Sequence, residues 1–451
     1  MKRVILVAKF LLLSSTITLA QNVSINNTGA SANASAMLDV SSNTKGVLLP
    51  RMTSVGRKNI VNPAMGLLVF DSAENTLYMF DGHHWLGFGA MTDQQRTSTN
   101  FVYGPDTQDT TLAGYSVSVW DQFAAIGVPY KRIGSSYTGG VYLYKLNGAQ
   151  WQYFTTLTPT GNNDASLYGC SVSIRGNYLA VGASSHKTFF GQVVGAAYIY
   201  NFNGSLWVNT QIIYGGNIGT NFGSQIAINQ FGNYLAVSET DVTVAGLAGA
   251  GVVNVYNKAA STFNFQYSIQ DPSPVAYSKF GSSMAMSPGG AYMMIGAPNK
   301  TVGGHAGYGY AGLYARNGTI WNEIHSLTPP LQDYLNLGAS VDISDNNVVY
   351  TCGKLFEIDN FNFSGYSCVF TDNINSVAID PATENMYAFV GNSTYQVISS
   401  SSYKIKTLGL DNTSQFPHIL SAYNKNFVAG MPYGADAAKP YIGVFYFGIG
   451  Q

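Results

Sequence analysis

Acidic side chains, the usual carriers of acid–base chemistry, are sparse in this chain and rarely cluster. Asp and Glu total 23 of 451 residues. The closest pairs are Asp342 with Asp345 and Asp380 with Glu384. Paired carboxylates could exchange protons with a substrate, but each pair flanks a predicted turn, where aspartate commonly bonds to the backbone. We therefore expect no catalytic residue among them.

Two other motifs that could bind a cofactor or a metal lie in an unsuitable context. Gly307, Gly309 and Gly312 match Gly-x-Gly-x-x-Gly, but a dinucleotide site needs this motif to open a helix, and here it leads into a predicted strand. His83 and His84 are adjacent, and neighbours on a strand point to opposite faces, which hinders chelation of one ion. We expect neither a cofactor nor a metal.

Aromatic and basic residues in long loops are the stronger candidates, because such side chains often anchor interfaces and loops on a rigid scaffold often carry function. If the flanking strands alternate in direction, these loops all emerge on one face, which we call the loop face. The alternative is that the side chains pack loop against loop. The candidate ligand-binding residues are Tyr130, Arg132, Tyr137, His186, Phe189, Phe190, His305, Tyr308, Tyr310 and Tyr433.

The elements that must position these loops repeat along the chain. The phrase GYSVSVWDQFAAIGVP recurs as GCSVSIRGNYLAVGA, FGSQIAINQFGNYLAVSE and FGSSMAMSPGGAYMMIGAP, with a weaker fifth copy, LGASVDISDNNVVYTCG. Its shared glycines are separated by 55, 54, 58 and 57 residues. A fixed period in this range indicates a repeat architecture. The shared glycines are Gly114, Gly169, Gly223, Gly281 and Gly338.

Each repeat has the pattern of four strands. A short strand of small residues, such as Ser116–Val119, is followed by an apolar run such as Phe123–Gly127, which predicts a strand buried on both faces. After a long loop come a strand such as Gly140–Tyr144, a turn that often contains Asn-Gly, and a fourth strand opened by an aromatic residue. Four-stranded units repeated radially form a β-propeller.

The number of repeats predicts an all-β protein with a seven-bladed β-propeller. Four clear units run to about residue 330, the fifth and sixth are shorter, and the seventh stops after its third strand, Gly443–Phe447. Residues 96–103 occupy the position of a fourth strand without a blade of their own. We predict that this N-terminal strand completes the seventh blade and closes the ring, because an open ring would expose two long sheet edges.

The repeated phrase resembles the FG-GAP repeat of the integrin α-subunit propeller and of many bacterial surface proteins. The resemblance is carried by Phe222-Gly223, Phe280-Gly281, Gly296-Ala297-Pro298 and the aromatic residues of the third strands. It covers about residues 96–451 and implies a propeller with a role in adhesion or recognition. Integrin-type units often hold calcium in an Asp-rich loop, whereas the turns here lack the carboxylates that calcium needs. The chain is therefore similar to a calcium-free bacterial variant.

The N-terminal region has two predicted parts. Lys2 and Arg3, an apolar stretch and small residues ending at Ala20 predict a signal peptide over residues 1–20. Residues 21–95 resemble a short β-rich module that precedes the main domain of bacterial surface and tail-fibre-like proteins, with a hairpin over residues 67–80. In fibre-like relatives such modules form trimer stalks, which implies a homo-oligomer presenting the propeller of residues 96–451.

Composition and cysteines limit the partners and the compartment. A net charge of −1 gives no electrostatic footprint for nucleic acid. No later segment has the roughly 18 uninterrupted apolar residues of a transmembrane helix. Cys170 stands where other repeats have serine and is predicted to be a buried small residue. Cys352 and Cys368 could form a disulfide in an oxidising compartment, although only coordinates show whether their geometry permits it.

These patterns together predict a secreted or cell-surface bacterial protein that is not an enzyme and recognises a protein or a glycan through its loop face. Two alternatives stay open. A propeller enzyme acting on polysaccharide would need two or three acidic or histidine side chains converging on the central face, and none is visible in the sequence. A structural subunit of a surface fibre would use the propeller as a tip or a spacer.

Overall fold

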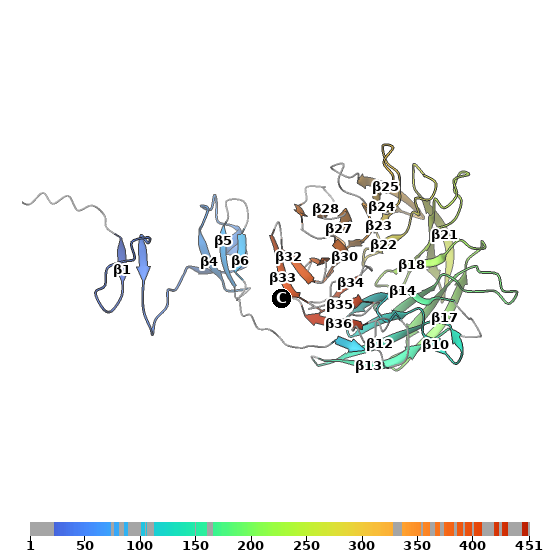
Figure 1. Cartoon of the computed structure of the whole chain (residues 1–451), viewed down its shortest axis with the longest axis horizontal. Helices are drawn as coiled ribbons and strands as arrows, with labels where there is room; N and C mark the ends of the chain where they lie inside the picture. The colour runs from blue at the N-terminus through green and yellow to red at the C-terminus, as the bar shows by residue number, and fades with distance from the viewer. Residues whose placement is uncertain are drawn as a thin grey trace, which may run out of the picture. The chain divides into compact units, whose positions relative to one another are not determined.

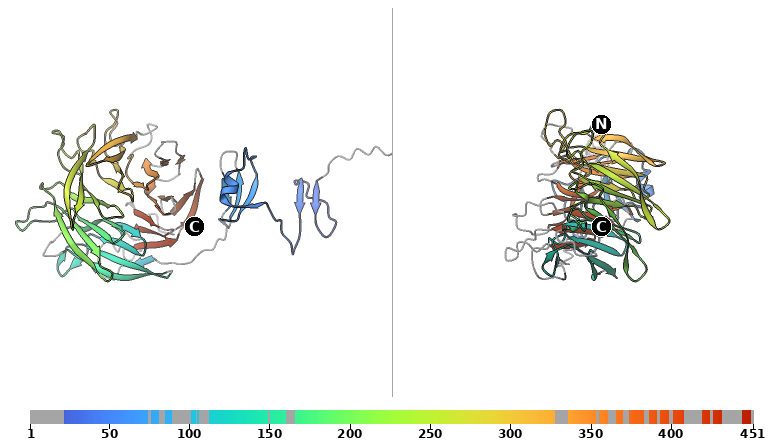
Figure 2. Two further views of the ribbon diagram at one scale, coloured as in Figure 1. Left: turned by 180° about the vertical axis from the view of Figure 1, so that it is seen from behind. Right: turned by 90° about the vertical axis from the view of Figure 1, so that its right-hand side faces the viewer.

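The computed structural model divides the chain into two compact units, Met1–Thr97 and Ser98–Gln451, shown in Figures 1 and 2. Among the described residues, α2 (Ser54–Lys58) is the single helix. The predicted signal peptide lies outside the described residues. The structure describes residues 22–73, 76–80, 85–88, 101–103, 105, 112–148, 150–159, 166–327, 336–352, 355–360, 366–369, 374–382, 386–390, 393–398, 401–407, 419–423, 426–431 and 444–449.

The N-terminal unit contains two small sheets. Strands β1 (Val23–Ile25) and β2 (Leu38–Val40) pair in parallel, and β3 (Arg51–Met52), β4 (Leu68–Asp71), β5 (Thr76–Phe80) and β6 (Trp85–Phe88) form a four-stranded sheet. The predicted hairpin corresponds to β4 and β5. Arg57 of α2 secures the second sheet, because its Nε lies 3.0 Å from Asp71 Oδ2 and its Cζ lies 3.5 Å from the Tyr78 ring centroid.

The second unit contains seven four-stranded antiparallel sheets among its described residues, consistent with propeller blades. Sheet 1 is β8 (Ser116–Trp120), β9 (Phe123–Val128), β12 (Gly140–Asn147) and β13 (Gln150–Leu157). Sheet 2 is β14 (Tyr168–Arg175), β15 (Tyr178–Ala183), β16 (Ala196–Phe202) and β17 (Trp207–Tyr214). Sheet 3 is β18 (Phe222–Ile228), β19 (Tyr234–Glu239), β20 (Val252–Ala259) and β21 (Thr262–Gln270). Sheet 4 is β22 (Ser283–Met286), β23 (Tyr292–Gly296), β24 (Ala311–Asn317) and β25 (Ile320–Leu327).

The last three sheets have the same four-strand pattern. Sheet 5 is β26 (Val341–Ile343), β27 (Asn347–Cys352), β28 (Leu355–Asn360) and β29 (Tyr366–Val369). Sheet 6 is β30 (Ile374–Ile379), β31 (Met386–Val390), β32 (Ser393–Ile398) and β33 (Ser401–Thr407). Sheet 7 is β34 (Ile419–Tyr423), β35 (Asn426–Met431), β36 (Val444–Ile449) and β7 (Phe101–Tyr103). The predicted pairing of the N-terminal strand with the end of the chain is confirmed, since Tyr103 lies opposite Val444.

Each of the first four sheets has the strand characters that the sequence predicts. The second strand is buried throughout in sheet 1, where all six residues of β9 are buried. The third and fourth strands shift register at one equivalent place in each sheet, between Leu143 and Tyr144 in sheet 1 and between Ile199 and Tyr200 in sheet 2. The register shift therefore recurs at the same place in these sheets, just as the spacing of the strands recurs in the sequence.

A three-part contact joins consecutive sheets and explains the repeated phrase. In sheet 1, Ser116 lies opposite Gly127, and its hydroxyl donates to the carbonyl of Gly169 in sheet 2 over 2.8 Å. A Cβ on Gly127 would overlap that carbonyl oxygen. Gly169 itself has φ +89°, a conformation that side chains disfavour. The same serine-to-carbonyl bond joins sheets 2 and 3 and sheets 4 and 5.

A second contact links the first strands themselves. The N–H of Ile174 in sheet 2 donates to Ser118 Oγ of sheet 1 over 3.1 Å, and the N–H of Ile228 in sheet 3 donates to Ser173 Oγ of sheet 2 over 3.2 Å. Each first strand contacts the first strand of the next sheet, and β34 of sheet 7 contacts β8 of sheet 1. The first strands therefore link each sheet to the next. The second, third and fourth strands of each sheet follow outward from its first strand.

Candidate binding site on the loop face

The loop of sheet 1 carries three predicted site residues. Strands β10 (Arg132–Ile133) and β11 (Ser136–Tyr137) form a short hairpin within it. Arg132 lies opposite Tyr137, and its Cζ is 5.1 Å from the Tyr137 ring centroid. Tyr130 precedes this hairpin and is 40% exposed. The structure therefore presents an arginine–tyrosine pair and a separate tyrosine to solvent.

The loop of sheet 2 separates an exposed pair from a buried histidine. Phe189 and Phe190 are 98% and 86% exposed, with ring centroids 5.5 Å apart. Adjacent exposed phenylalanines are the kind of apolar patch that often marks an interaction surface. His186 is buried, and its Nδ1 lies 3.1 Å from the Tyr198 hydroxyl. Burial lowers the pKa of His186, so a neutral ring supports the loop from within.

The loop of sheet 4 shows the same division. His305 and Tyr308 stack with their ring centroids 4.5 Å apart and their planes 8° from parallel. Tyr310 is buried, and its hydroxyl lies between Tyr314 (3.0 Å) and Glu323 (2.7 Å). We expected His186 and Tyr310 to be exposed on the loop face, but the rings of both residues are buried. Tyr433 lies outside the described residues.

A depression of about 200 Å³ lies where the loop sides of the first sheets converge. The residue after each of the first four repeat glycines lines this depression, so four repeats contribute an equivalent position. These are Tyr115, Cys170, Ser224 and Ser282. The first strand β18 supplies Gln225, and the segments after the second strands or before the first strands supply the remaining residues, which are Pro129, Tyr130, Leu167, Ser184 and Thr240.

The lining of this depression is suited to hydrogen bonding and ring contacts. Tyr115 and Tyr130 are 38% and 40% exposed, and serine and threonine hydroxyls can both donate and accept. Burial raises the pKa of the Cys170 thiol, so it lacks the thiolate character of a nucleophile. Of the predicted residues, Tyr130 lines the depression. The other lining residues were not predicted as site residues, although Tyr115, Cys170, Ser224 and Ser282 share a position after a repeat glycine that the sequence shows.

The strand pairing argues against the possible disulfide between Cys352 and Cys368. Cys352 of β27 pairs with Leu355 of β28, whereas Cys368 of β29 pairs with Phe356 of β28. The two cysteines therefore flank an intervening strand. Adjacent strands lie about 4.8 Å apart, so β27 and β29 are separated by about twice that distance, beyond the Cα spacing of about 4.4–6.8 Å that a disulfide spans.

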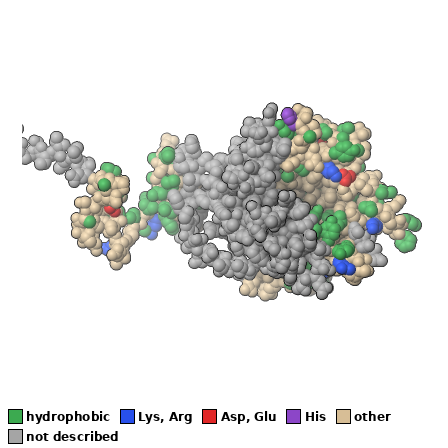
Figure 3. Space-filling model, in the orientation of Figure 1, with side chains coloured by type: hydrophobic (Ala, Val, Ile, Leu, Met, Phe, Trp, Pro, Cys, Tyr) green, Lys and Arg blue, Asp and Glu red, His purple; other side chains and the backbone are tan. Residues whose placement is uncertain are grey.

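The N-terminal unit displays an apolar face. Val23 lies opposite Leu38, and Ile25 lies opposite Val40. These four side chains share one side of the two-stranded sheet because alternate residues point the same way. They are 54%, 59%, 57% and 38% exposed, respectively. Figure 3 shows hydrophobic side chains on the surface of this unit.

Comparison with known families finds two matching regions in the chain. Residues 151–200, from β13 to β16, match the FG-GAP repeat, and residues 24–101 match a family described as a phage tail like trimerisation region. The chain carries an FG-GAP repeat region and an N-terminal phage-tail-like trimerisation region. No curated protein matches the chain.

Two further features concern the residues that the structure describes. Within them, no group of three His, Cys, Asp or Glu side chains is placed to hold a metal ion. Nor does the described part of the chain contain a helix long and apolar enough to cross a membrane. The depression and the exposed loop side chains are the candidate functional features among these residues.

Proposed function

We propose that the seven sheets form a closed seven-bladed propeller. Three observations support closure. Strand β7 completes sheet 7, β34 of sheet 7 contacts β8 of sheet 1, and the Val119 N–H donates to Ser421 Oγ as equivalent residues do between consecutive sheets.

We propose that the N-terminal unit assembles three chains into a homotrimer. The match to a trimerisation region supports this, and so does the apolar face of β1 and β2. A two-stranded sheet is marginally stable by itself in water, and its exposed valines, isoleucine and leucine would be covered by copies of the same sheet. Three propellers held together would bind a repetitive surface with avidity.

We propose that the protein is a non-enzymatic binding protein, secreted to or displayed on a bacterial surface, that recognises a protein or a glycan through its loop face. The observation that carries this proposal is the depression to which four FG-GAP-type repeats each give an equivalent residue. Its described lining has hydroxyls and tyrosines but no carboxylate or histidine, which favours recognition over acid–base chemistry. The signal-peptide pattern supports export.

The proposal is tested by screening the full chain on glycan arrays and against surface proteins, and then replacing both Tyr115 and Tyr130 with alanine. Binding should fall by at least about tenfold, since aromatic anchors often dominate an interface. Phe231→Ala is the matched control, because it removes a 62% exposed ring from the turn between β18 and β19, on the opposite face. Equal binding by the double variant and the wild type would contradict the assignment.

A structural role in a surface fibre is the second candidate, favoured by the phage-tail-like region. In that case the purified trimer would assemble into longer fibres visible by electron microscopy. The Ala variant at Tyr115 and Tyr130 would then leave fibre formation unchanged. A discrete trimer that captures a ligand would instead support the binding role.

A further inference from the structure

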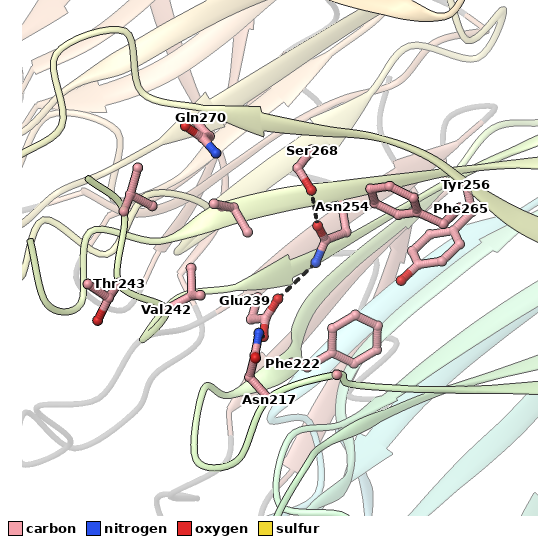
Figure 4. Close-up of a pocket in the computed structure, with 13 residues that line it drawn as sticks. Asn217, Phe222, Glu239, Val242, Thr243, Asn254, Tyr256, Phe265, Ser268 and Gln270 are labelled. Atoms are coloured by element: carbon pink, nitrogen blue, oxygen red, sulfur yellow. Dashed lines mark hydrogen bonds between the residues drawn. The ribbon is translucent and has the colours of Figure 1, made fainter. Parts of the chain in front are cut away.

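A second pocket, of about 370 Å³, lies on one face of sheet 3. Val252, Asn254 and Tyr256 alternate along β20 and therefore share that face, with Ser268 and Gln270 opposite them on β21. Phe222 of β18, Glu239 of β19, Phe265 of β21 and residues of the loops before β18 and after β19 complete the lining. Figure 4 shows the labelled side chains surrounding one open space.

A buried carboxylate, Glu239, forms one wall of this pocket and departs from the repeat pattern. Sheets 2 and 4 have Ala183 and Ala297 at the equivalent position. Glu239 is 5% exposed. Its Oε1 accepts hydrogen bonds from Thr220 Oγ1 (2.7 Å) and Asn217 Nδ2 (3.2 Å), and its Oε2 accepts one from Asn254 Nδ2 (3.0 Å).

The amide of Asn254 is itself held in place. Ser268 Oγ donates to Asn254 Oδ1, which leaves the Asn254 amino group directed at Glu239. The carboxylate is thus fixed by neutral donors from the loop before β18 and from β20. Such an arrangement orients the negative charge without cancelling it.

No counter-charge for Glu239 is found in the described part of the chain, where no Lys, Arg or His nitrogen lies within salt-bridge distance of it. The contrast with Asp241 is direct, because Asp241, two residues along, lies 2.7 Å from Lys279 Nζ. Buried carboxylates are seldom left without a cation. A positive group brought by a ligand would complete this site.

Aromatic rings form the wall beside the carboxylate. Tyr256 and Phe265 meet edge to face with centroids 5.9 Å apart, and Phe222 lines the same space. Burial and the nearby Glu239 charge raise the pKa of Tyr256, so its hydroxyl keeps its proton. Aromatic faces attract ammonium and guanidinium groups, and do so more strongly when water is excluded.

We propose that this pocket binds a cationic side chain, the ammonium of a lysine or the guanidinium of an arginine, on a partner protein. The pocket volume is within the range of about 300–1,000 Å³ typical of ligand sites. The inference rests on the proposed binding role and makes it specific, because the loops that line the pocket emerge on the loop face.

The test uses the folded full chain and four small probes, measured by calorimetry or NMR titration. N-acetyl-arginine amide and N-acetyl-lysine amide should bind, whereas their neutral counterparts made from citrulline and norleucine should bind at least about tenfold more weakly. Glu239→Gln should reduce binding of the charged probes by about tenfold, equivalent to about 1.4 kcal/mol. Asp121→Asn is the control, because it removes one exposed negative charge at a φ of +49° that asparagine tolerates.

Several outcomes would overturn the proposal: equal binding of charged and neutral probes, no binding by the wild type, or unchanged binding by Glu239→Gln. If circular dichroism shows that this variant is unfolded, Gln270→Glu decides, because it adds a carboxylate at an exposed lining position. Tighter binding of the charged probes would support the site, and unchanged binding would refute it.

Glucosamine and N-acetylglucosamine form a further arm, since an amino sugar would bring the same ammonium. Preference for glucosamine over both amino-acid probes would refute a protein partner. The probes report on this pocket alone, so their binding does not depend on the central depression. If the Tyr115 and Tyr130 variant binds its large ligand as well as the wild type does, while the probes still bind and Glu239→Gln weakens them, only the proposed function is contradicted.

Discussion

The backbone N–H of Val119 donates a 3.0 Å hydrogen bond to the hydroxyl of Ser421, 302 residues away. Ile174 makes the same bond to Ser118, and Ile228 makes it to Ser173. Sheet 7 therefore meets sheet 1 through the contact that sheets 1, 2 and 3 use among themselves. The adjacent ring pair of Trp120 and Tyr423, with centroids 4.0 Å apart, strengthens this junction.

Ser421→Ala should destabilise the second unit by about 1–3 kcal/mol, because it leaves the N–H of Val119 buried without an acceptor. The measurement is the midpoint of urea unfolding. Ser173→Ala is the matched control, because Ser173 accepts the equivalent bond and is buried to nearly the same extent, 8% against 9% exposed. Equal losses support a closed ring, whereas a negligible effect of Ser421→Ala alone would speak against it.

Gly296→Ala should cost about 1–3 kcal/mol or more, because the new methyl group would overlap the Gly338 carbonyl and the Ser283 hydroxyl. Thermal unfolding followed by circular dichroism measures the loss. Gly216→Ala makes the same substitution at a position with nothing within 4 Å and no positive φ, and it should change the midpoint little. Similar effects of the two changes would refute the close approach.

His186 should make stability depend on pH. Its pKa lies below the ordinary 6.5 because of burial, so the unfolded chain takes up this proton more readily than the folded one. The stability that the neutral ring contributes is present above pH 6.5 and falls as the pH drops toward the lowered value. His186→Gln should therefore shrink the difference between urea midpoints measured at about pH 7.5 and about pH 5.5. An identical difference in both proteins would exclude this role.

Ile25→Asp should shift the proposed homotrimer toward monomers, because it places a charge on the apolar face of β1 and β2. Light scattering or native mass spectrometry gives the mass. Ser24→Asp is the control on the same strand, since its side chain points to the opposite side of the sheet. If both variants remain trimeric, the apolar face is not the contact between chains.

Much of the fold was predictable because the repeated phrase encodes both strand pairing and sheet-to-sheet contact. Ser116, Gly127 and Gly169 recur because they meet at one point between two sheets. The pairing of Phe101–Tyr103 with the end of the chain followed from the strand that the last repeat lacks. Such regularities are visible in a sequence because each copy repeats them.

The candidate site was less predictable, because loops do not repeat. Residue type alone did not show that the rings of His186 and Tyr310 turn inward. The spacing of Cys352 and Cys368 did not show that β28 lies between them. Glu239 was not predicted for another reason. It stands at a position where one repeat differs from the others, whereas the prediction used the residues that the repeats share.

The serine-to-carbonyl contact limits how freely these units could be exchanged. In sheet 3, Ser238 replaces the glycine and Gln225 replaces its partner serine, and the Gln225 N–H donates to the Ser238 hydroxyl over 2.8 Å. If serine alone replaced this glycine in another repeat, its side chain would collide with the carbonyl oxygen of the glycine in the following repeat. A repeat could therefore be moved or duplicated within this chain only if the contacting residues of the neighbouring sheets were transferred with it.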